Sequence, residues 1–500
     1  MDQTPPRKSH PKGLYVLFAT EMWERFNYYG MRAILVLFMT KALLFDKAFA
    51  SNLYGSYTSL VYLTPLLGGY IADRYWGNRR SIIIGGIVMA LGEFVLFFCG
   101  STYAASPQFS SVLFYSGLGL MIAGNGFFKP NISSLVGQLY PKGDRRIDAA
   151  YTIFYMGINV GGAIGPFICG LVGDTGNPAD FKWAFLAGGI GMLLGVLVQQ
   201  FFHKKYVTDP DNKVLGLTPE TSSAKWINPV SVVIGLVLLS GAMIGLLYID
   251  LKVVSYLTYL LIASVLLIAF VVFSDTSLSK IDKQKIAVIF IVAFFVIFFW
   301  SAFEQAGASL TFFAEEQTKR DLGFYVVPAS FFQSLNSIFV VSFAPLFAWL
   351  WLKMGKHEPS SPFKMAMGLF LLALGYLWIA FGVKNVQPGI KVSMIWLIGM
   401  YALHTWGELC LSPIGLSLVN KLAPLKFASL LMAVWFLANA AANKLAGVLS
   451  ALYPDSGHTT VFLGYHMSNL YDFFMLFVFM AGLASLILFF ISGKLKKMMN

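Results

Sequence analysis

The chain has 500 residues, a formal net charge of +12 and a sequence pI of about 9.3. Hydrophobic residues make up 57% of it and charged residues only 12%, about half the charged share of soluble proteins. A water-soluble globule of this size needs more polar surface, so the mean hydropathy of +0.69 excludes a soluble enzyme, a disordered chain and a secreted disulfide scaffold. The composition indicates a polytopic membrane protein.

The N-terminal residues 1–13 are polar and rich in proline, without the apolar core and small-residue cleavage site of a secretory signal. We expect a short tail followed by a first span that stays in the mature protein. About 14 apolar stretches are long enough to cross a hydrocarbon core of ~30 Å. Their predicted limits are 14–42, 53–73, 81–101, 109–138, 147–173, 181–202, 228–249, 254–273, 286–314, 326–352, 362–383, 392–419, 427–453 and 470–493.

Basic residues gather on one side of this pattern. The termini and alternate loops hold about 24 Lys and Arg residues, and the opposite side holds about 8. Because basic loops stay in the cytoplasm, we expect a multi-pass protein of the inner (plasma) membrane with both termini cytoplasmic. That orientation requires an even number of spans, which agrees with 14.

Two polar breaks divide the spans. The stretch 203–226 ends a first group of six, and a basic break at 274–285 precedes the last six. The predicted organisation is a cytoplasmic tail (1–13), a six-helix bundle (14–202), a linker with two accessory helices that face lipid (203–285), a second six-helix bundle (286–493) and a cytoplasmic tail (494–500). This all-α integral membrane plan of 6+6 helices plus a two-helix insertion is that of the major facilitator fold, which places its substrate site between the halves near the midplane.

The first span carries four charged side chains, although an ionisable group in a spanning helix costs at least a few kcal/mol. Six polar residues fall on one of its helical faces: Glu21, Glu24, Arg25, Tyr28, Tyr29 and Arg32. We interpret this face as functional, because four charges and two phenols exceed what packing requires. The alternative is an internal salt bridge from Glu21 to Arg25 that only holds helices together.

Lys129 lies deep in the fourth span, and a buried ammonium needs an acidic partner to stay charged. Glu304 in the ninth span and Glu408 in the twelfth are the candidate partners. If the bundles are related by a pseudo-two-fold axis, the fourth span faces the twelfth and the first faces the ninth. This arrangement predicts the pairs Lys129–Glu408 and Arg32–Glu304, with static links between helices as the alternative.

Further polar and aromatic residues lie at membrane depth: Tyr62, Asn159, Trp300, Asn336, His404, Trp435 and Asn439. A single membrane Asn is as often a link between helices as a ligand contact. Glu93 and Lys444 are also intramembrane, and for both we expect a structural pairing. Of the six histidines we expect only His404 to be buried.

Four motifs carry a family resemblance. They are ExxERFxYY at Glu21–Tyr29, a glycine-rich and basic loop at Gly69–Arg80, FYxxINxG at Phe154–Gly161, and ExxxSPxGLS at Glu408–Ser417. By these motifs the chain resembles the proton-dependent oligopeptide transporters, a branch of the major facilitator superfamily. The resemblance covers essentially the whole chain, including the two-helix insertion typical of bacterial members. The first and third motifs are specific to this family, whereas the loop alone is weak evidence for it.

The resemblance implies proton-coupled symport of di- and tripeptides into the cell by alternating access, driven by protons and not by a cofactor. It implies that Glu21, Glu24, Arg25 and Glu304 couple protons. It implies peptide binding by Arg25, Tyr28, Tyr29, Arg32, Tyr62, Lys129, Asn159, Trp300, Asn336, Glu408, Trp435 and Asn439. The chain departs from the family pattern at Gly55, where animal relatives have a coupling histidine, and at Asn439, where some bacterial members have serine.

These residues suit peptides chemically. Every di- or tripeptide offers an ammonium and a carboxylate, whereas its side chains vary, so a promiscuous site clamps the ends with charge and surrounds the middle with aromatic walls. Glu408 opposite Lys129 and the first-helix arginines would form such a clamp. We expect Arg32–Glu304 to be an external gate that a proton on Glu304 opens, and Lys129–Glu408 to be its internal counterpart.

Two other transport-related functions and an enzyme are the alternatives to this one. A carrier of nitrate or another anion shares the fold and could use the same basic residues, but anion-carrying relatives tend to lack ExxER. A peptide sensor that does not transport is a second alternative. An enzyme would need a nucleophile with a base or a metal cluster, and neither pattern is visible. The expected partners are the peptide, protons and the lipid bilayer, not nucleic acid, and we expect a monomer.

Overall fold

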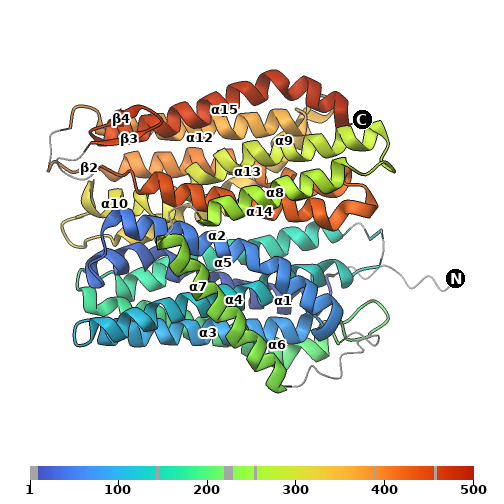
Figure 1. The fold of residues 1–500 in the computed structure, drawn as a ribbon, viewed down its shortest axis with the longest axis horizontal. Helices are drawn as coiled ribbons and strands as arrows, with labels where there is room; N and C mark the ends of the chain where they lie inside the picture. The colour runs from blue at the N-terminus through green and yellow to red at the C-terminus, as the bar shows by residue number, and fades with distance from the viewer. Residues whose placement is uncertain are drawn as a thin grey trace. The chain divides into compact units, whose positions relative to one another are not determined.

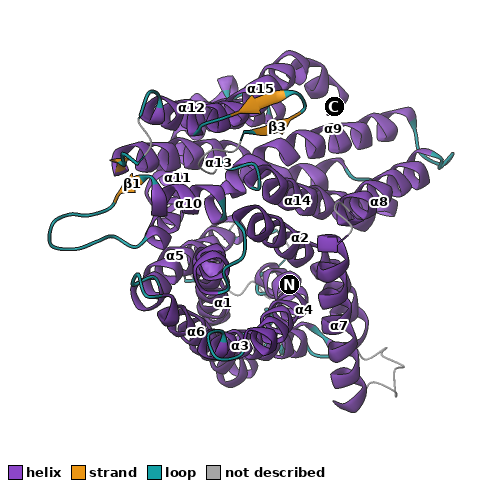
Figure 2. Ribbon diagram, turned by 60° about the vertical axis from the view of Figure 1, so that its left-hand side comes forward, coloured by secondary structure: helices purple, strands orange, loops and turns teal. Residues whose placement is uncertain are grey.

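The computed structural model describes residues 9–141, 143–144, 146–218, 229–252, 256–386, 389–454 and 459–499. Most of the predicted N-terminal tail, part of the linker and the side chains at the end of the Glu408–Ser417 motif lie outside the described residues. The described chain is almost wholly helical (Figure 1 and Figure 2). Its helices are α1 (Lys12–Leu37), α2 (Lys47–Ile71), α3 (Asn78–Thr102), α4 (Pro107–Gln138), α5 (Ile147–Gly173), α6 (Phe181–Tyr206), α7 (Pro229–Lys252), α8 (Tyr256–Phe273), α9 (Lys280–Phe303), α10 (Ser309–Glu316), α11 (Ser334–Met354), α12 (Ser361–Val383), α13 (Met394–Leu422), α14 (Ala428–Ser450) and α15 (Leu470–Met499).

Except for α10, each of these helices has at least 18 residues and coincides with one predicted span. By length and composition, ten apolar segments of the described chain could cross a membrane. The segment α1 is not among them because Glu21, Glu24, Arg25 and Arg32 interrupt its apolar sequence. Two small sheets complete the fold: β1 (Thr318–Lys319) runs parallel to β2 (Val392–Ser393), and β3 (Thr460–Phe462) runs antiparallel to β4 (Tyr465–Met467).

The chain forms two compact units. Unit 1 comprises Met1–Arg32, Thr64–Gly173 and Ala179–Ile244, and unit 2 comprises Ala33–Leu63, Asp174–Pro178 and Gly245–Asn500. The functional residues predicted from the sequence are divided between these units.

Unit 1 is built around close contacts of α3 with α4 and α6 (Figure 2). Where α3 crosses α4, a Cβ atom added to Gly85 would lie 2.6 Å from the carbonyl oxygen of Gly124, and one added to Gly124 would lie 2.6 Å from that of Gly85. Only glycine permits backbones to approach this closely in a membrane bundle. The glycines therefore set the distance between α3 and α4.

Unit 2 packs α12 against α13 and α15, and α9 against α14 (Figure 2). Ala293 of α9 and Val434 with Ala438 of α14 form a buried apolar cluster. The first part of α2 also belongs to this unit and crosses α14 at a glycine pair, since a Cβ at Gly55 would lie 2.6 Å from the Cα of Gly447.

The ninth predicted span, 286–314, is not one continuous helix. The helix α9 ends at Phe303, residues Glu304–Gly307 form a 3₁₀ turn, and α10 follows after Ala308, whose φ of −136° and ψ of −94° are not helical. At this break the Gln305 Nε2 donates to the carbonyl oxygen of Ser301 and to that of Ala446 of α14, each at 3.0 Å.

The helices α7 and α8 expose large apolar side chains. Val237 and Leu238 of α7 are 64% and 67% exposed, and Phe270 of α8 is 70% exposed. Exposed apolar surface of this kind is suited to contact with lipid. The sequence-based expectation of lipid-facing accessory helices agrees with this exposure.

A polar cluster lies between α4 and α5 in unit 1. The guanidinium of Arg146 forms an ion pair with Asp144 at 2.7 Å and donates to the carbonyl oxygen of Ser9 at 2.8 Å, while the His10 Nδ1 lies 2.7 Å from the Tyr140 hydroxyl. Hydrogen bonding by Arg146 lowers the pKa of Asp144 to about 2. The cluster therefore ties the chain just before α1 to the loop after α4.

Asp144→Asn is expected to lower the thermal unfolding temperature slightly at neutral pH, because it removes the negative charge that binds Arg146. The folded-state pKa of Asp144 is depressed, so its contribution is present above the unfolded value of about 3.9 and is lost as the pH falls towards about 2. Unfolding measured over this range should show the difference between wild type and variant shrinking with acidification. A difference that does not change with pH contradicts this account.

Candidate functional site

The polar face of α1 holds a buried ion-pair group. Arg25 Nε lies 2.7 Å from Glu21 Oε1 and 3.0 Å from Glu24 Oε2, and the three residues are 5%, 2% and 0% exposed. The spacing i, i+3 and i+4 places both carboxylates beside the same guanidinium. The Glu21–Arg25 bridge weighed as a structural alternative therefore exists, but as part of a three-residue group within one helix.

Two residues of α4 complete the surroundings of Glu24. Asn125 Nδ2 donates to Glu24 Oε1 at 3.1 Å, and the partly buried Lys129 interacts electrostatically with Glu24. Since Asn125 and Lys129 are one helical turn apart, both side chains lie on one face of α4. Two carboxylates, one guanidinium and one ammonium thus form a cluster of zero net charge, which makes their burial tolerable.

The carboxylate of Glu21 retains an unused acceptor. Its Oε2 is buried and makes no hydrogen bond within the part of the chain that the structure describes. Buried polar atoms without partners are rare in folded proteins and call for an explanation. The available oxygen can accept a further hydrogen bond.

The remaining predicted residues of unit 1 lie near this group in sequence or on α5. Tyr28 and Tyr29 make an edge-to-face contact with ring centroids 5.3 Å apart, and the Arg32 guanidinium lies 5.6 Å from the Tyr29 ring centroid. On α5, Asn159 Nδ2 donates at 2.9 Å to the carbonyl oxygen of Tyr155, one turn earlier in its own helix.

Unit 2 brings two predicted carboxylates into one region. Glu304, at the end of α9, and Glu408, on α13, are 5% and 9% exposed and interact electrostatically. Asn336 of α11 donates from Nδ2 to Glu408 Oε2 at 2.8 Å and to Thr405 Oγ1 at 3.1 Å. Two nearby carboxylates repel each other, and a bound cation relieves that repulsion. The region therefore suits an ammonium group or a proton.

Aromatic residues predicted to line the site are also placed in unit 2. The Trp300 ring lies 5.2 Å from the rings of both Phe299 and Phe303, centroid to centroid. Trp435 of α14 is 7% exposed, and Asn439 donates to its carbonyl oxygen at 2.9 Å. Tyr62 of α2 is half-buried.

The two predicted gating pairs stay predictions. Lys129 and Arg32 belong to unit 1, whereas Glu408 and Glu304 belong to unit 2. Each pair therefore links residues of different units.

Two intramembrane charges have structural partners. Glu93 of α3 is fully buried and accepts a hydrogen bond at 2.9 Å from Asn27, which also donates to the carbonyl oxygen of Gly188. Lys444 of α14 donates to Ser56 Oγ at 2.9 Å, next to the Gly55 crossing. These contacts fit the structural role expected from the sequence.

The expectation that only His404 is buried is wrong. His203 is also fully buried and contacts Gln199 at 2.7 Å and the carbonyl oxygen of Leu215 at 2.9 Å. The error came from placing position 203 in a polar break, whereas α6 continues to Tyr206. Among the described residues, no group of three or more His, Cys, Asp or Glu side chains could hold a metal ion.

Sequence reasoning missed a set of ion pairs in unit 2. Lys41, after α1, pairs with Glu315 of α10, and Lys47, at the start of α2, pairs with Glu316 at 2.7 Å. Arg320 also pairs with Glu315. These pairs hold the segment 33–63 against α10. These residues belong to segments far apart in the sequence, and nothing in the local sequence indicates that they meet.

Comparisons with known proteins place this chain in a family. A family model described as "PTR2: POT family" matches residues 79–464. The chain is 35% identical to "Peptide transporter YePEPT" of Yersinia enterocolitica over 88% of this chain and 87% of the relative, and 32% identical to the "Di-/tripeptide transporter" of Lactococcus lactis subsp. cremoris over 89% and 90%. It is also 37% identical to "Uncharacterized transporter YclF" of Bacillus subtilis over 91% and 90%.

Solved structures agree with these sequence matches. The crystal structure of peptide transporter POT in complex with sulfate matches with a TM-score of 0.80 at 32% identity, covering 99% of this chain and 97% of that one. A POT family transporter in complex with a thioalcohol-conjugated peptide matches with a TM-score of 0.80 at 31% identity, covering 97% of both chains. These matches confirm the predicted family, the all-helical major facilitator fold with 14 spans and the transporter class. The chain belongs to the POT family, and it is a multi-pass membrane peptide transporter and not an enzyme.

Proposed function

We propose that this protein carries di- and tripeptides into the cell together with protons, by alternating access. The observation that carries the proposal is the buried group on α1, in which one arginine joins two carboxylates and Glu21 keeps an unused oxygen. Such a group can gain or lose a proton at small cost in structure, because the arginine remains paired with the other carboxylate. The names of the Yersinia and Lactococcus relatives support peptides as the substrate class.

The ends of the peptide would be bound by opposite charges. Lys129, Arg25 and Arg32 would bind the carboxylate, since guanidinium and ammonium groups make strong charge-assisted hydrogen bonds to it. Glu408 would bind the peptide ammonium, oriented by the hydrogen bond from Asn336. The side chains and backbone of the bound peptide would contact aromatic and amide residues that accept side chains of different shape: Tyr28, Tyr29, Tyr62, Asn159, Trp300, Trp435 and Asn439.

The proton step would act through Glu304. A proton on this carboxylate would weaken its attraction to Arg32 and let the two bundles part on the external side. Peptide binding would loosen the internal pair Lys129–Glu408, because the peptide termini compete for both charges. We propose further that both termini lie in the cytoplasm and that the transporter acts as a monomer in the inner membrane.

Glu408→Gln is expected to weaken dialanine binding by about 10-fold or more, because it removes a hydrogen bond between a carboxylate and an ammonium. Binding of N-acetyl-dialanine, which has no ammonium, should change much less. Competition against a labelled dipeptide measures both affinities. Asp211→Asn is the matched control, since it also replaces a carboxylate by an amide and Asp211 is exposed on the loop after α6. Equal losses for both peptides contradict the assigned role of Glu408.

Uptake into proteoliposomes tests the function as a whole. Dialanine should accumulate only with an inward proton gradient or an inside-negative potential, and a proton ionophore should abolish the accumulation. Nitrate uptake under the same conditions would support the anion carrier instead. Tight dialanine binding without any transport would support the sensor and overturn the proposal.

A further inference from the structure

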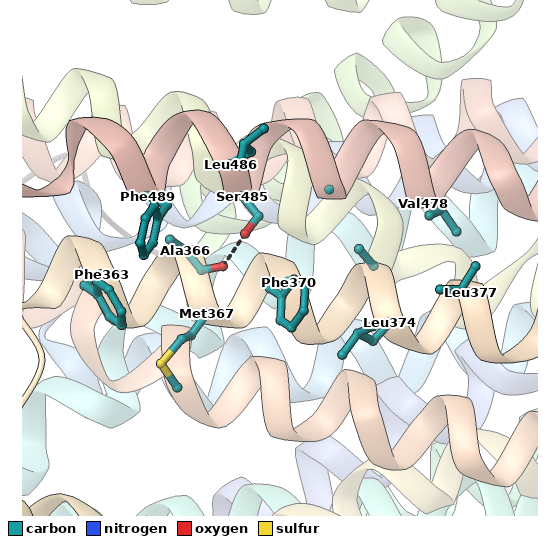
Figure 3. Close-up of a pocket in the computed structure, with 12 residues that line it drawn as sticks. Phe363, Ala366, Met367, Phe370, Leu374, Leu377, Val478, Ser485, Leu486 and Phe489 are labelled. Carbon is teal, nitrogen blue, oxygen red and sulfur yellow. Dashed lines mark hydrogen bonds between the residues drawn. The ribbon is translucent and has the colours of Figure 1, made fainter.

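An apolar groove runs between α12 and α15 in unit 2. Its volume is about 530 Å³, and its lining residues are Phe363, Ala366, Met367, Phe370, Ala373, Leu374, Leu377, Val478, Gly482, Ser485, Leu486 and Phe489. Figure 3 shows Phe363 and Phe489 at one end and Leu377 and Val478 at the other. The Ser485 hydroxyl, a polar group in this lining, already donates to the carbonyl oxygen of Ala366 at 2.8 Å. The groove therefore offers an apolar surface, and the Ser485 hydroxyl is not free to bind a polar ligand.

The groove opens towards the membrane and has the length of one lipid leaflet. Phe370, Leu486 and Phe489 are 51%, 53% and 48% exposed although all three line it. From Val478 to Phe489 the helix rises about 16 Å, at about 1.5 Å per residue. One leaflet contributes about half of the ~30 Å hydrocarbon core. An acyl chain that enters at Phe489 would thus end near the middle of the bilayer, at Val478.

Positive charge surrounds the Phe489 end. Residues 350–364 and 489–499 contain six lysines and one carboxylate. That carboxylate, Glu358, already forms an ion pair with Lys364. Among the other lysines, Lys496 is exposed and lies 11 residues after Ser485 and seven after Phe489, so it continues the groove-lining face of α15. This placement puts an ammonium where a lipid phosphate would lie.

We propose that the groove between α12 and α15 binds an anionic phospholipid, with one acyl chain along the groove and the phosphate at Lys496. The apolar lining and the length of the groove suit a lipid acyl chain, and the lysine-rich end suits a negatively charged headgroup. The site is separate from the residues assigned to peptides and protons, so it holds whether or not the proposed coupling is correct.

Gly482 gives a direct way to close the groove. A Cβ atom at this position would have the Cβ of Ala373 as its nearest neighbour at 3.9 Å, an ordinary contact, so a larger side chain fits by entering the groove. Gly482→Phe should therefore fill the space without disturbing the packing of α12 on α15. Leu483→Phe is the matched control, because Leu483 is 60% exposed on the same helix and does not line the groove.

Native mass spectrometry of the full-length protein, titrated with phosphatidylglycerol or phosphatidylcholine, tests the proposal. We expect one retained phosphatidylglycerol, bound roughly fivefold or more tightly than phosphatidylcholine. Gly482→Phe should abolish this adduct, and Lys496→Gln should remove the preference for phosphatidylglycerol. Leu483→Phe and Lys494→Gln, a control of equal charge on another face of α15, should leave both unchanged.

The other outcomes overturn the proposal in different ways. Retention of the adduct by Gly482→Phe would place the lipid elsewhere. Equal binding of both lipids, with no effect of Lys496→Gln, would show a groove for any acyl chain and no headgroup site. Association of a second copy, lost in Gly482→Phe, would identify the groove as a protein interface.

Discussion

Glu304→Gln is expected to abolish proton-driven accumulation of dialanine while leaving exchange of internal for external dialanine close to the wild-type rate. Glutamine has the shape of the protonated carboxylic acid but cannot release a proton, so the variant should remain in the protonated form of the cycle. A substitution here should have a large effect on transport, because Glu304 is 5% exposed at the break between α9 and α10 and interacts electrostatically with Glu408. Accumulation and counterflow in proteoliposomes measure the two activities separately.

The control for this prediction is Asp211→Asn, which also replaces a carboxylate by an amide, on the exposed loop after α6, and should preserve both activities. Accumulation retained by Glu304→Gln would remove Glu304 from the coupling scheme. Loss of exchange together with accumulation would also contradict the assigned role, because it would indicate that Glu304 is needed for the movement of the peptide itself.

Replacing Arg25 by methionine is expected to lower the free energy of unfolding by about 3–5 kcal/mol. The variant would leave the carboxylates of Glu21 and Glu24 buried next to each other without the guanidinium that now lies 2.7 and 3.0 Å away. Denaturant or thermal unfolding in detergent measures the change. Arg80→Met, on an exposed position at the start of α3, should have little effect.

A combined variant shows whether uncompensated charge is the cause. Adding Glu21→Gln to Arg25→Met removes one carboxylate together with the guanidinium and leaves Glu24 to balance Lys129. The double variant should recover most of the lost stability, because the cluster again has no net charge. A double variant as unstable as Arg25→Met alone would mean that lost packing, and not buried charge, explains the effect.

Much of the site could be predicted because helical spacing is a local property. Glu21 and Arg25 are four residues apart, so their ion pair follows from the helix alone, and the structure places them as expected. The contact between the adjacent residues Glu24 and Arg25 does not follow from this spacing. The family resemblance assigns both Asn336 and Glu408 to peptide binding, and the two residues form a hydrogen bond. The spans were predictable for a similar reason, since a long apolar run on a membrane protein has few alternatives to a helix.

Other features depend on tertiary contacts that local patterns do not contain. At the break near Glu304, Gln305 donates to the carbonyl oxygens of Ser301 and of Ala446 on α14, and the second contact joins residues far apart in the sequence. Lys41 and Glu315 are separated by more than half the chain, and only the packing of residues 33–63 in unit 2 brings them together. The burial of His203 depended on where α6 ends, and helix ends are the least reliable part of a sequence-based assignment.

The most direct test of the central claim is whether peptide movement drives proton movement. Proteoliposomes would contain a pH indicator, start with equal pH on both sides and a clamped potential, and then receive an inward dialanine gradient. The account predicts acidification of the lumen by the wild-type protein and none by Glu304→Gln. Entry of dialanine into wild-type vesicles without acidification would contradict proton coupling and identify the protein as a peptide carrier of another kind.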